Sequence, residues 1–312
     1  MGSADKSTLK GSDWIWKDGS FVAWQDAHIH VLSTAVQFGA SIFEGIRCYD
    51  TPDGPAIFRL PEHIRRFHDS ARIYRMPLKY SIDELVEACC ETVRKNGLTS
   101  GYVRPMAVWG YGSASMDPRN SPLEEYVCAW PWGTYLGEEA LTRGVDVCVS
   151  SWQRMHPNTY PAAAKMAGHY VNAQLMKMEA AANGYAEAIA LGTGGLVSEG
   201  SGQNLFLVRD GIVFTPNLDG TSLPGITRDA VITIAGDLGY EVRERDVPRE
   251  SLYTADELFF TGTATEVTPI RSVDRIEVGG GSRGPVTEAI QRRFMDTVKG
   301  QTEDAHGWLT RV

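Results

Sequence analysis

The stretch TYPAAAKMAGHY, residues 159–170, places a single lysine, Lys165, among alanines and a methionine with little polar company. A fold that buries this stretch leaves the Lys165 amine poorly solvated. Desolvation disfavours the ammonium form and favours the neutral amine, which attacks carbonyl groups. The alternative is a solvated lysine near the start of an alanine-rich helix, and lysines are usually exposed. The rest of the chain decides between these two interpretations.

Length and charge bound the fold and the function. With 312 residues, the chain has about twice the usual length of one domain, which favours two domains. The net charge of −9 argues against a nucleic-acid binder, because a phosphate backbone requires a basic face. No apolar run approaches the roughly 18 residues of a membrane span, and no N-terminal signal pattern is present. Residues 1–12 are rich in Ser, Gly and Lys and are typical of a disordered lead or tag.

The cysteines and histidines do not form a metal-binding pattern. The five cysteines include no CxxC pair, and an odd number without a framework is typical of reduced thiols in a cytoplasmic protein. His28 and His30 are the only close histidine pair, and no third ligand is near them in sequence. We therefore predict no metal site.

Alternating and helical patterns recur in both halves of the chain, which predicts two α+β domains. The segment PWGTYLG, residues 131–137, is the candidate boundary. We expect a smaller N-terminal domain over 13–133, an interdomain loop over 134–140 and a larger C-terminal domain over 141–312. Helices are predicted over 61–74, 81–96, 170–183, 226–238 and 286–299, and a hairpin over 14–24.

Nine short motifs in a fixed order carry a resemblance to a known family. They are FEGIR (43–47), EHxxRF (62–67), YVRP (102–105), PWG (131–133), AK (164–165), SEG (198–200), NLF (204–206), LPGITR (223–228) and TGT (261–263). With them the chain resembles the branched-chain amino-acid aminotransferases of the class IV, or fold-type IV, pyridoxal-phosphate family, from Trp14 to about Leu309. The resemblance implies the D-amino-acid aminotransferase-like fold of two mixed α/β domains, with the cofactor bound by the larger one.

The resemblance implies a role for each polar group around the cofactor, pyridoxal 5'-phosphate. Lys165 forms the Schiff base with the cofactor aldehyde and then moves the proton between the substrate α-carbon and the cofactor. Glu199 holds the pyridine nitrogen protonated, and Tyr170 contacts the ring oxygen. From the residues alone, Glu199 could equally be a solvated carboxylate at a strand end, and Tyr170 an ordinary buried tyrosine.

Two signals indicate a phosphate site. Ile226 and Thr227 open a predicted helix, whose free N–H groups and positive dipole end suit a dianion. Arg66 can add a charge-assisted contact, and Thr263 resembles the third phosphate contact of the family. Surface charge is the alternative for Arg66, which only the EHxxRF match singles out.

The substrate residues come from the resemblance as well. Phe43, Trp132 and Tyr135 resemble an aromatic wall for an apolar side chain, although core packing would explain any one of them. Tyr102 and Arg104 alternate on one predicted strand and so face the same way. In the family this pair contacts carboxylates. The turn that receives the α-carboxylate corresponds to Gly262, Thr263 and Ala264.

The activity implied is transamination between leucine, isoleucine or valine and 2-oxoglutarate, in branched-chain amino-acid biosynthesis, by a cytoplasmic homodimer or a multiple of dimers. Relatives acting on D-amino acids, aminodeoxychorismate or (R)-amines are the alternative, which the Tyr102 and Arg104 pair together with Arg47 disfavours. Two departures bear on the substrate range. Phe38 stands where many relatives carry tyrosine, and the loop 110–118, which in the family reaches the neighbouring subunit's site, lacks the usual run.

A different enzyme class has nominal support in GGGSRG, residues 279–284, which matches both a hydrolase elbow around Ser282 and a dinucleotide loop. Under thirty residues follow it, too few for the remaining parts of either site. A glycine-rich surface turn is the better interpretation. A non-catalytic binding protein would not need Lys165, Glu199 and an anion site together.

Overall fold

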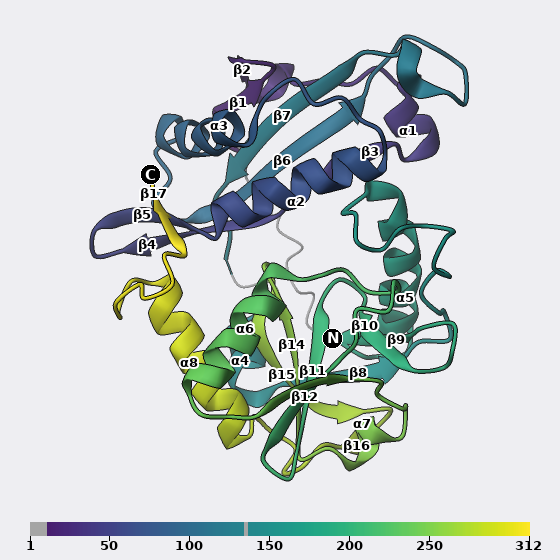
Figure 1. Cartoon of the computed structure of the whole chain (residues 1–312), viewed down its shortest axis with the longest axis vertical. Coiled ribbons are helices and arrows are strands. Elements are labelled where there is room, and N and C mark those ends of the chain that lie inside the picture. The colour runs from purple at the N-terminus through teal and green to yellow at the C-terminus, as the bar shows by residue number, and fades with distance from the viewer. Residues whose placement is uncertain (1–10, 134–136) are drawn as a thin grey trace. The chain divides into compact units, whose positions relative to one another are not determined.

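The computed structural model describes residues 11–133 and 137–312. The chain forms two compact units, called here unit 1 (residues up to 133 together with 303–312) and unit 2 (134–302). Each unit combines a β-sheet with helices (Figure 1), as an α+β fold requires. Most of the predicted lead at 1–12 lies outside the described residues, as do residues 134–136 of the predicted interdomain loop.

The described strands of unit 1 form one antiparallel eight-stranded sheet, in the order β17-β5-β4-β6-β7-β1-β2 with β3 beside β6. The strands are β1 (Trp14–Lys17), β2 (Ser20–Ala23), β3 (Ser41–Phe43), β4 (Ile46–Thr51), β5 (Gly54–Phe58), β6 (Gly101–Trp109), β7 (Leu123–Trp130) and β17 (Leu309–Arg311). The hairpin predicted over 14–24 is confirmed as β1 and β2, which pair directly.

One predicted boundary is wrong. The sequence predicts 141–312 as a single domain, but the last strand, β17, pairs antiparallel with β5 and so belongs to unit 1. The backbone N–H of Arg59 also donates to the Trp308 carbonyl at 2.7 Å. Pairing between strands at opposite ends of the chain leaves no signal in the local sequence.

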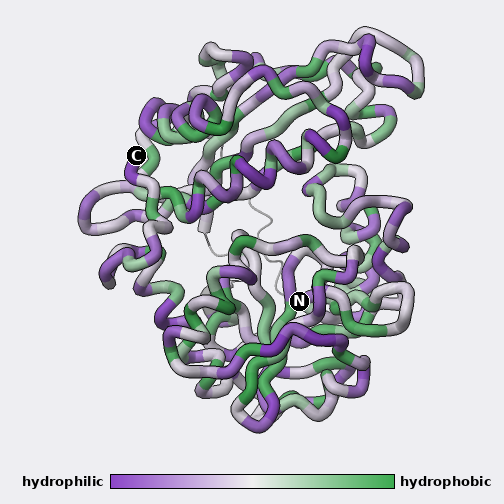
Figure 2. The backbone as a smooth tube through the Cα atoms, viewed as in Figure 1, coloured by the Kyte–Doolittle hydropathy of each residue, from purple (hydrophilic) through white to green (hydrophobic). Residues whose placement is uncertain are grey.

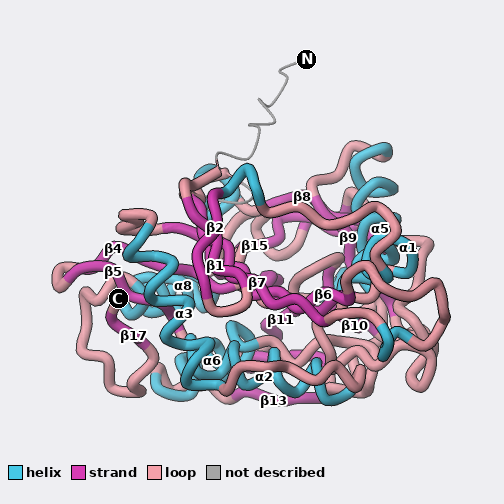
Figure 3. Tube along the Cα trace, turned by 90° about the horizontal axis from the view of Figure 1, so that it is seen from above, coloured by secondary structure: helices cyan, strands magenta, loops and turns pink. Residues whose placement is uncertain are grey.

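The helices of unit 1 are α1 (Thr34–Phe38), α2 (Leu60–Ile73) and α3 (Ile82–Lys95), with 3-10 turns η1 (Trp24–Asp26) and η2 (Pro118–Asn120). The helix predicted over 81–96 is confirmed as α3, and a capping box begins it, because Ser81 and Glu84 each bond the other's backbone N–H. Helices α2 and α3 lie on the same side of strands β6 and β7 (Figure 3).

Unit 2 contains a mixed nine-stranded sheet among its described residues, in the order β10-β9-β8-β15-β14-β11-β12-β13 with β16 beside β15. The strands are β8 (Val145–Val149), β9 (Glu187–Leu191), β10 (Val197–Gly200), β11 (Asn204–Arg209), β12 (Ile212–Pro216), β13 (Val242–Arg245), β14 (Glu257–Gly262), β15 (Glu266–Val273) and β16 (Ile276–Glu277). Figure 2 shows hydrophobic residues gathered along the central strands of this sheet.

The helices of unit 2 are α4 (Glu138–Arg143), α5 (Tyr170–Ala182), α6 (Ile226–Asp237), α7 (Ser251–Thr254) and α8 (Pro285–Val298), with the 3-10 turn η3 (Ala167–His169). The interdomain loop predicted over 134–140 is wrong from residue 138, where α4 begins. Helices α6 and α8 pack against each other and against β14. Among the described residues, no helix is both long and apolar enough to cross a bilayer.

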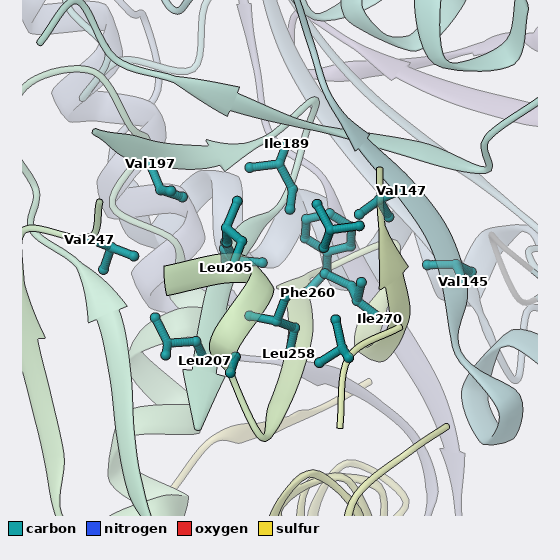
Figure 4. Close-up of a cluster of buried hydrophobic side chains, with 14 of the residues drawn as sticks. Val145, Val147, Ile189, Val197, Leu205, Leu207, Val247, Leu258, Phe260 and Ile270 are labelled. Atoms are coloured by element: carbon teal, nitrogen blue, oxygen red, sulfur yellow. The ribbon is translucent and has the colours of Figure 1, made fainter. Parts of the chain in front are cut away.

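The sheet of unit 2 sorts side chains by face, and this places the polar residues of the candidate site. Leu205 and Phe260 are cross-strand partners and belong to the apolar cluster in Figure 4. Successive residues on a strand point to opposite faces. Asn204 and Thr261, the next pair along, therefore point to the other face, the same face as the stacked rings of Phe206 and Phe259.

Candidate active site

Lys165 lies in the loop that precedes η3, not in a helix, so the interpretation of a solvated helix lysine is wrong. It is half-buried between two buried neighbours, Ala164 and Met166. Its Nζ donates a hydrogen bond to the Tyr170 hydroxyl at 2.6 Å. Because Tyr170 begins α5, the helix fixes the direction in which the amine points.

Glu199 is buried, with 4% of its surface exposed, so it is not a solvated strand-end carboxylate. One oxygen accepts from the Asn204 side-chain amide at 3.2 Å and from the Leu223 backbone N–H at 3.1 Å. The other oxygen pairs with Arg154 at 2.9 Å. Three separate segments of unit 2 therefore fix this carboxylate, as a buried charge requires.

The electrostatics connect Glu199 with the lysine. Burial raises the pKa of the Glu199 carboxyl above its ordinary value, while Arg154, the Leu223 N–H and the Lys165 ammonium oppose that rise. The positive charge of Lys165 therefore lowers the pKa of the Glu199 carboxyl, against the effect of burial. An amine and a carboxylate of increased proton affinity lie in one part of unit 2.

Arg154 is a residue that the sequence prediction missed. It is 7% exposed, and its Nε donates to the Thr221 carbonyl at 3.1 Å while the guanidinium pairs with Glu199. Removing one partner of such a buried pair leaves an uncompensated charge, which is strongly destabilising. The sequence around Arg154, SWQRMHP, carries no motif that distinguishes it from a surface arginine.

The predicted helix at Ile226 is confirmed as α6, and its start suits an anion. Gly225 is the N-cap residue, and no side chain caps the helix. A Cβ at Gly225 would lie 1.9 Å from the Asn204 Oδ1, so this approach requires glycine. Because the first N–H groups of a helix have no partner within it, the amides at Ile226 and Thr227 can bind an anion.

The end of β14 and the turn that follows it add two buried hydroxyls. The side-chain oxygens of Thr261 and Thr265 are buried and have no hydrogen-bond partner. Glu266 closes the turn opposite Gly262 with a left-handed backbone, φ 54°. Thr261 pairs across the sheet with Asn204, so the turn lies beside the residue that bonds Glu199. Thr263 and Ala264 are half-buried within it.

These residues of unit 2 fit the cofactor that the sequence predicts. The Lys165 amine matches the cofactor aldehyde, the Tyr170 phenol its ring oxygen and the buried Glu199 carboxylate its pyridine nitrogen. The uncapped helix start and the two unpaired hydroxyls match the phosphate. The described residues thus provide a partner for each polar group of pyridoxal 5'-phosphate.

In unit 1, Arg66 belongs to a buried charge cluster and is not surface charge. The fully buried Glu44 accepts from Arg66 at 2.7 and 2.8 Å and from His63 at 2.7 Å. Burial opposes ionisation, yet Arg66 and His63 together hold the pKa of Glu44 well below its ordinary value. Glu44 and His63 lie in the quoted FEGIR and EHxxRF motifs, but nothing in the residue pattern assigns them a role.

Unit 1 also brings the predicted substrate residues Phe43, Tyr102, Arg104 and Trp132 together. The guanidinium carbon of Arg104 lies 4.7 Å from the Phe43 ring centre and 5.3 Å from that of Tyr102. The rings of Tyr102 and Trp132 are 5.4 Å apart. Tyr135 lies outside the described residues.

Ser282, on which the hydrolase alternative depends, is exposed on the loop between β16 and α8. Its neighbour Arg283 bonds Gln291 at 2.6 Å and Glu288 at 2.7 Å. These contacts attach the loop to α8, as expected for a glycine-rich surface turn.

Comparisons with known proteins agree with this geometry. The family model described as Amino-transferase class IV matches residues 41–273. The branched-chain-amino-acid aminotransferase of Escherichia coli K12 is 53% identical over 98% of this chain and 99% of its own. The crystal structure of the Escherichia coli enzyme has a TM-score of 0.94 at 52% identity, covering 96% of this chain and 99% of the other. The branched-chain aminotransferase of Thermoproteus uzoniensis with norvaline has a TM-score of 0.91 at 42% identity, covering 96% of this chain and 99% of the other.

His169, between the lysine loop and α5, gives the site a pH dependence. It is 4% exposed, and burial together with the Arg154 charge lowers its pKa to about 4. The unfolded chain binds this proton near pH 6.5, so stability falls as the pH drops from about 6.5 to about 4. As the pH drops through that window, the free energy of unfolding of His169→Gln should fall by roughly 1–3 kcal/mol less than that of the wild type. Denaturant titration at each pH measures this difference. Equal losses in the two proteins would contradict the assignment.

Proposed function

The chain belongs to the class IV aminotransferase family, and we propose that it transfers the amino group of leucine, isoleucine or valine to 2-oxoglutarate with pyridoxal 5'-phosphate as cofactor. The observation that carries this proposal is the grouping in unit 2 of Lys165, the buried Glu199 and the uncapped start of α6. The names of its relatives support the substrate class.

Lys165 is the catalytic residue in this proposal. When bound, the cofactor supplies an aldehyde for amino-group transfer and a ring that stabilises negative charge at the substrate α-carbon. The Lys165 Nζ is the amine that attaches to this aldehyde. Lys165 would also remove and return the proton at the substrate α-carbon. The 2.6 Å bond to Tyr170 directs the amine, and the Tyr170 hydroxyl is also the partner for the ring oxygen.

Glu199 holds a proton at the pyridine nitrogen. Its buried carboxylate has an increased affinity for protons, and the bonds from Asn204 and Leu223 keep one oxygen in position. Arg154 offsets the charge of Glu199 on the other side. A protonated ring nitrogen makes the ring a stronger electron acceptor, which is what proton removal at the α-carbon requires.

In unit 2, the N–H groups of Ile226 and Thr227 and the Thr263 side chain bind the phosphate. These two N–H groups lie at the positive end of the α6 dipole. Arg66 of unit 1 stays a phosphate contact predicted from the resemblance. Arg66 is oriented by Glu44 through two parallel hydrogen bonds, a geometry that fixes a guanidinium more firmly than a single contact.

The proposed substrate contacts are those that the sequence predicts. The amides of Gly262, Thr263 and Ala264 receive the α-carboxylate, and Phe43 and Trp132 form the aromatic wall for a branched side chain. Tyr102 and Arg104 contact the side-chain carboxylate of the dicarboxylic partner. Tyr135 remains a predicted wall residue.

An amino-donor panel read by absorbance tests the function. We expect L-leucine to convert the bound cofactor to its amine form, so that its absorbance at about 410–430 nm disappears. D-alanine and an (R)-amine should leave this absorbance unchanged. Lys165→Ala should lose the yellow colour and roughly 10³-fold or more of turnover, because it removes both nucleophile and base. The exposed lysine variant Lys299→Ala serves as control and should retain both. Conversion by D-alanine or an (R)-amine but not by L-leucine would replace this proposal with the alternative activity.

We further propose that the chain forms a homodimer, or a multiple of dimers, through an apolar patch of unit 1. The patch consists of Val31, Leu32, Val36, Phe38, Tyr111 and Met116, which are 46–79% exposed. The Thr34 N–H donates to the Gly110 carbonyl at 3.3 Å, and the His30 and Tyr111 rings stack, so the two segments form one surface. Monomeric proteins rarely expose so continuous an apolar surface.

Light scattering tests the dimer. The double variant Val31→Glu, Met116→Glu should be monomeric and should lose activity, because two charges would be buried at the interface. A control at an exposed residue of unit 2, Ile276→Glu, should keep the wild-type mass. A wild-type monomer that is fully active would contradict the proposed assembly.

The proposed location is the cytoplasm. The five cysteines are all free thiols, and burial raises the pKa of each. Unpaired cysteines are typical of a reducing compartment, which supports this location.

A further inference from the structure

Three buried N–H donors without an acceptor lie close together in unit 1. They are Nε of Arg104, Nε1 of Trp130 and Nε1 of Trp132. Buried polar groups in native proteins are almost always hydrogen-bonded, so each exception requires an explanation. Trp130 is 7% exposed and is not among the residues that the sequence motifs single out.

The three donors belong to one cluster. Trp130 on β7 is the direct cross-strand partner of Tyr102 on β6, which places both rings on one face of the sheet. The Arg104 guanidinium carbon lies 5.6 Å from the Trp130 ring centre. The Trp132 ring stands edge-on to Trp130 at 6.2 Å. The Phe43 ring also packs against the Arg104 guanidinium.

The Tyr102 ring, which the two tryptophans contact, is held in place. A Cβ at Gly45 would lie 1.9 Å from the Tyr102 hydroxyl, so the backbone of Gly45 closes over this side chain. The rings of Tyr102 and Trp130 lie 5.3 Å apart. The indole of Trp130 therefore packs against a fixed neighbour, and its N–H keeps a defined direction.

The chemistry of the cluster selects one kind of ligand. An indole N–H and a guanidinium donate hydrogen bonds and accept none. Among the described residues, Arg104 forms no ion pair with a carboxylate. The missing group is therefore an acceptor with negative charge, and the surrounding rings require an apolar stem. A carboxylate on a short aliphatic chain meets both requirements.

We propose that Trp130 is a specificity-determining residue whose indole N–H, together with Arg104 Nε–H, binds the distal carboxylate of the dicarboxylic substrate. This inference rests on the proposed transamination and assigns the residue that separates its two substrates. A branched aliphatic side chain packs against the same rings and leaves both donors unpaired. A site that hydrogen-bonds one substrate discriminates strongly against an analogue that lacks the bonding group.

The test is Trp130→Phe, which keeps an aromatic ring and removes the N–H. For the cofactor-loaded variant, kcat/KM with 2-oxoglutarate should fall roughly 10–100-fold, mainly through KM. Turnover with 4-methyl-2-oxopentanoate, the oxo acid of leucine, should change less than about twofold, because that substrate does not use the bond. Trp130→His restores a ring N–H and should recover part of the dicarboxylate activity.

A binding measurement provides a readout independent of turnover. In calorimetric titrations, glutarate should bind Trp130→Phe roughly 10-fold more weakly than wild type, and 4-methylpentanoate should bind both alike. Trp16→Phe is the matched control, since Trp16 is also buried in unit 1 but packs against Tyr80. It should leave both affinities unchanged.

The outcomes separate this inference from the proposed function. Equal losses for both ligands in Trp130→Phe would show a packing role, and no loss for either would show no role; each result overturns the inference while leaving transamination intact. A wild-type protein that converts neither oxo acid would instead overturn the proposed function.

Discussion

The buried ion pair between Glu199 and Arg154, 2.9 Å apart, is the constraint on which the cofactor site depends. A carboxylate without solvent must be paired and hydrogen-bonded, and the pair reaches this state only when several segments meet. Arg154 follows β8, Asn204 begins β11, and Leu223 precedes α6. Fixing one carboxylate thus also fixes the start of α6, the helix proposed to bind the phosphate. The sheet and its loops are organised so that acid, amine and anion site share one location.

The same principle operates in unit 1 with different residues. Glu44 is buried and pairs with Arg66 and His63, so an arginine proposed for phosphate is already oriented before any anion binds. Arg104, by contrast, has aromatic neighbours and no carboxylate partner among the described residues. In the proposed function, the Arg104 guanidinium can therefore form an ion pair with a substrate carboxylate. Arg66 is thus paired with a buried carboxylate and Arg104, in the described chain, is not, and Arg104 is the arginine proposed to pair with a substrate carboxylate.

Local chemistry was predictable from the sequence, and distant partnerships were not. The capping box at Ser81, the helix start at Gly225 and the weak solvation of Lys165 depend on residues within a few positions, and the structure has all three. Arg154 and the strand β17 depend on partners far away in the chain, with no local pattern to mark them. Motif resemblance named Arg66 but not its partner Glu44, because a motif records residue types and not contacts. Trp130 became visible only through its unpaired N–H.

The central claim is that Glu199 keeps the cofactor's ring nitrogen protonated inside a buried site. The most direct measurement is the ¹⁵N NMR shift of the ring nitrogen in protein reconstituted with labelled pyridoxal 5'-phosphate. We predict a protonated nitrogen in the wild type across neutral pH and an unprotonated one in Glu199→Gln, which lacks the negative charge. An unprotonated nitrogen in the wild type, or an unchanged shift in the variant, would contradict the account.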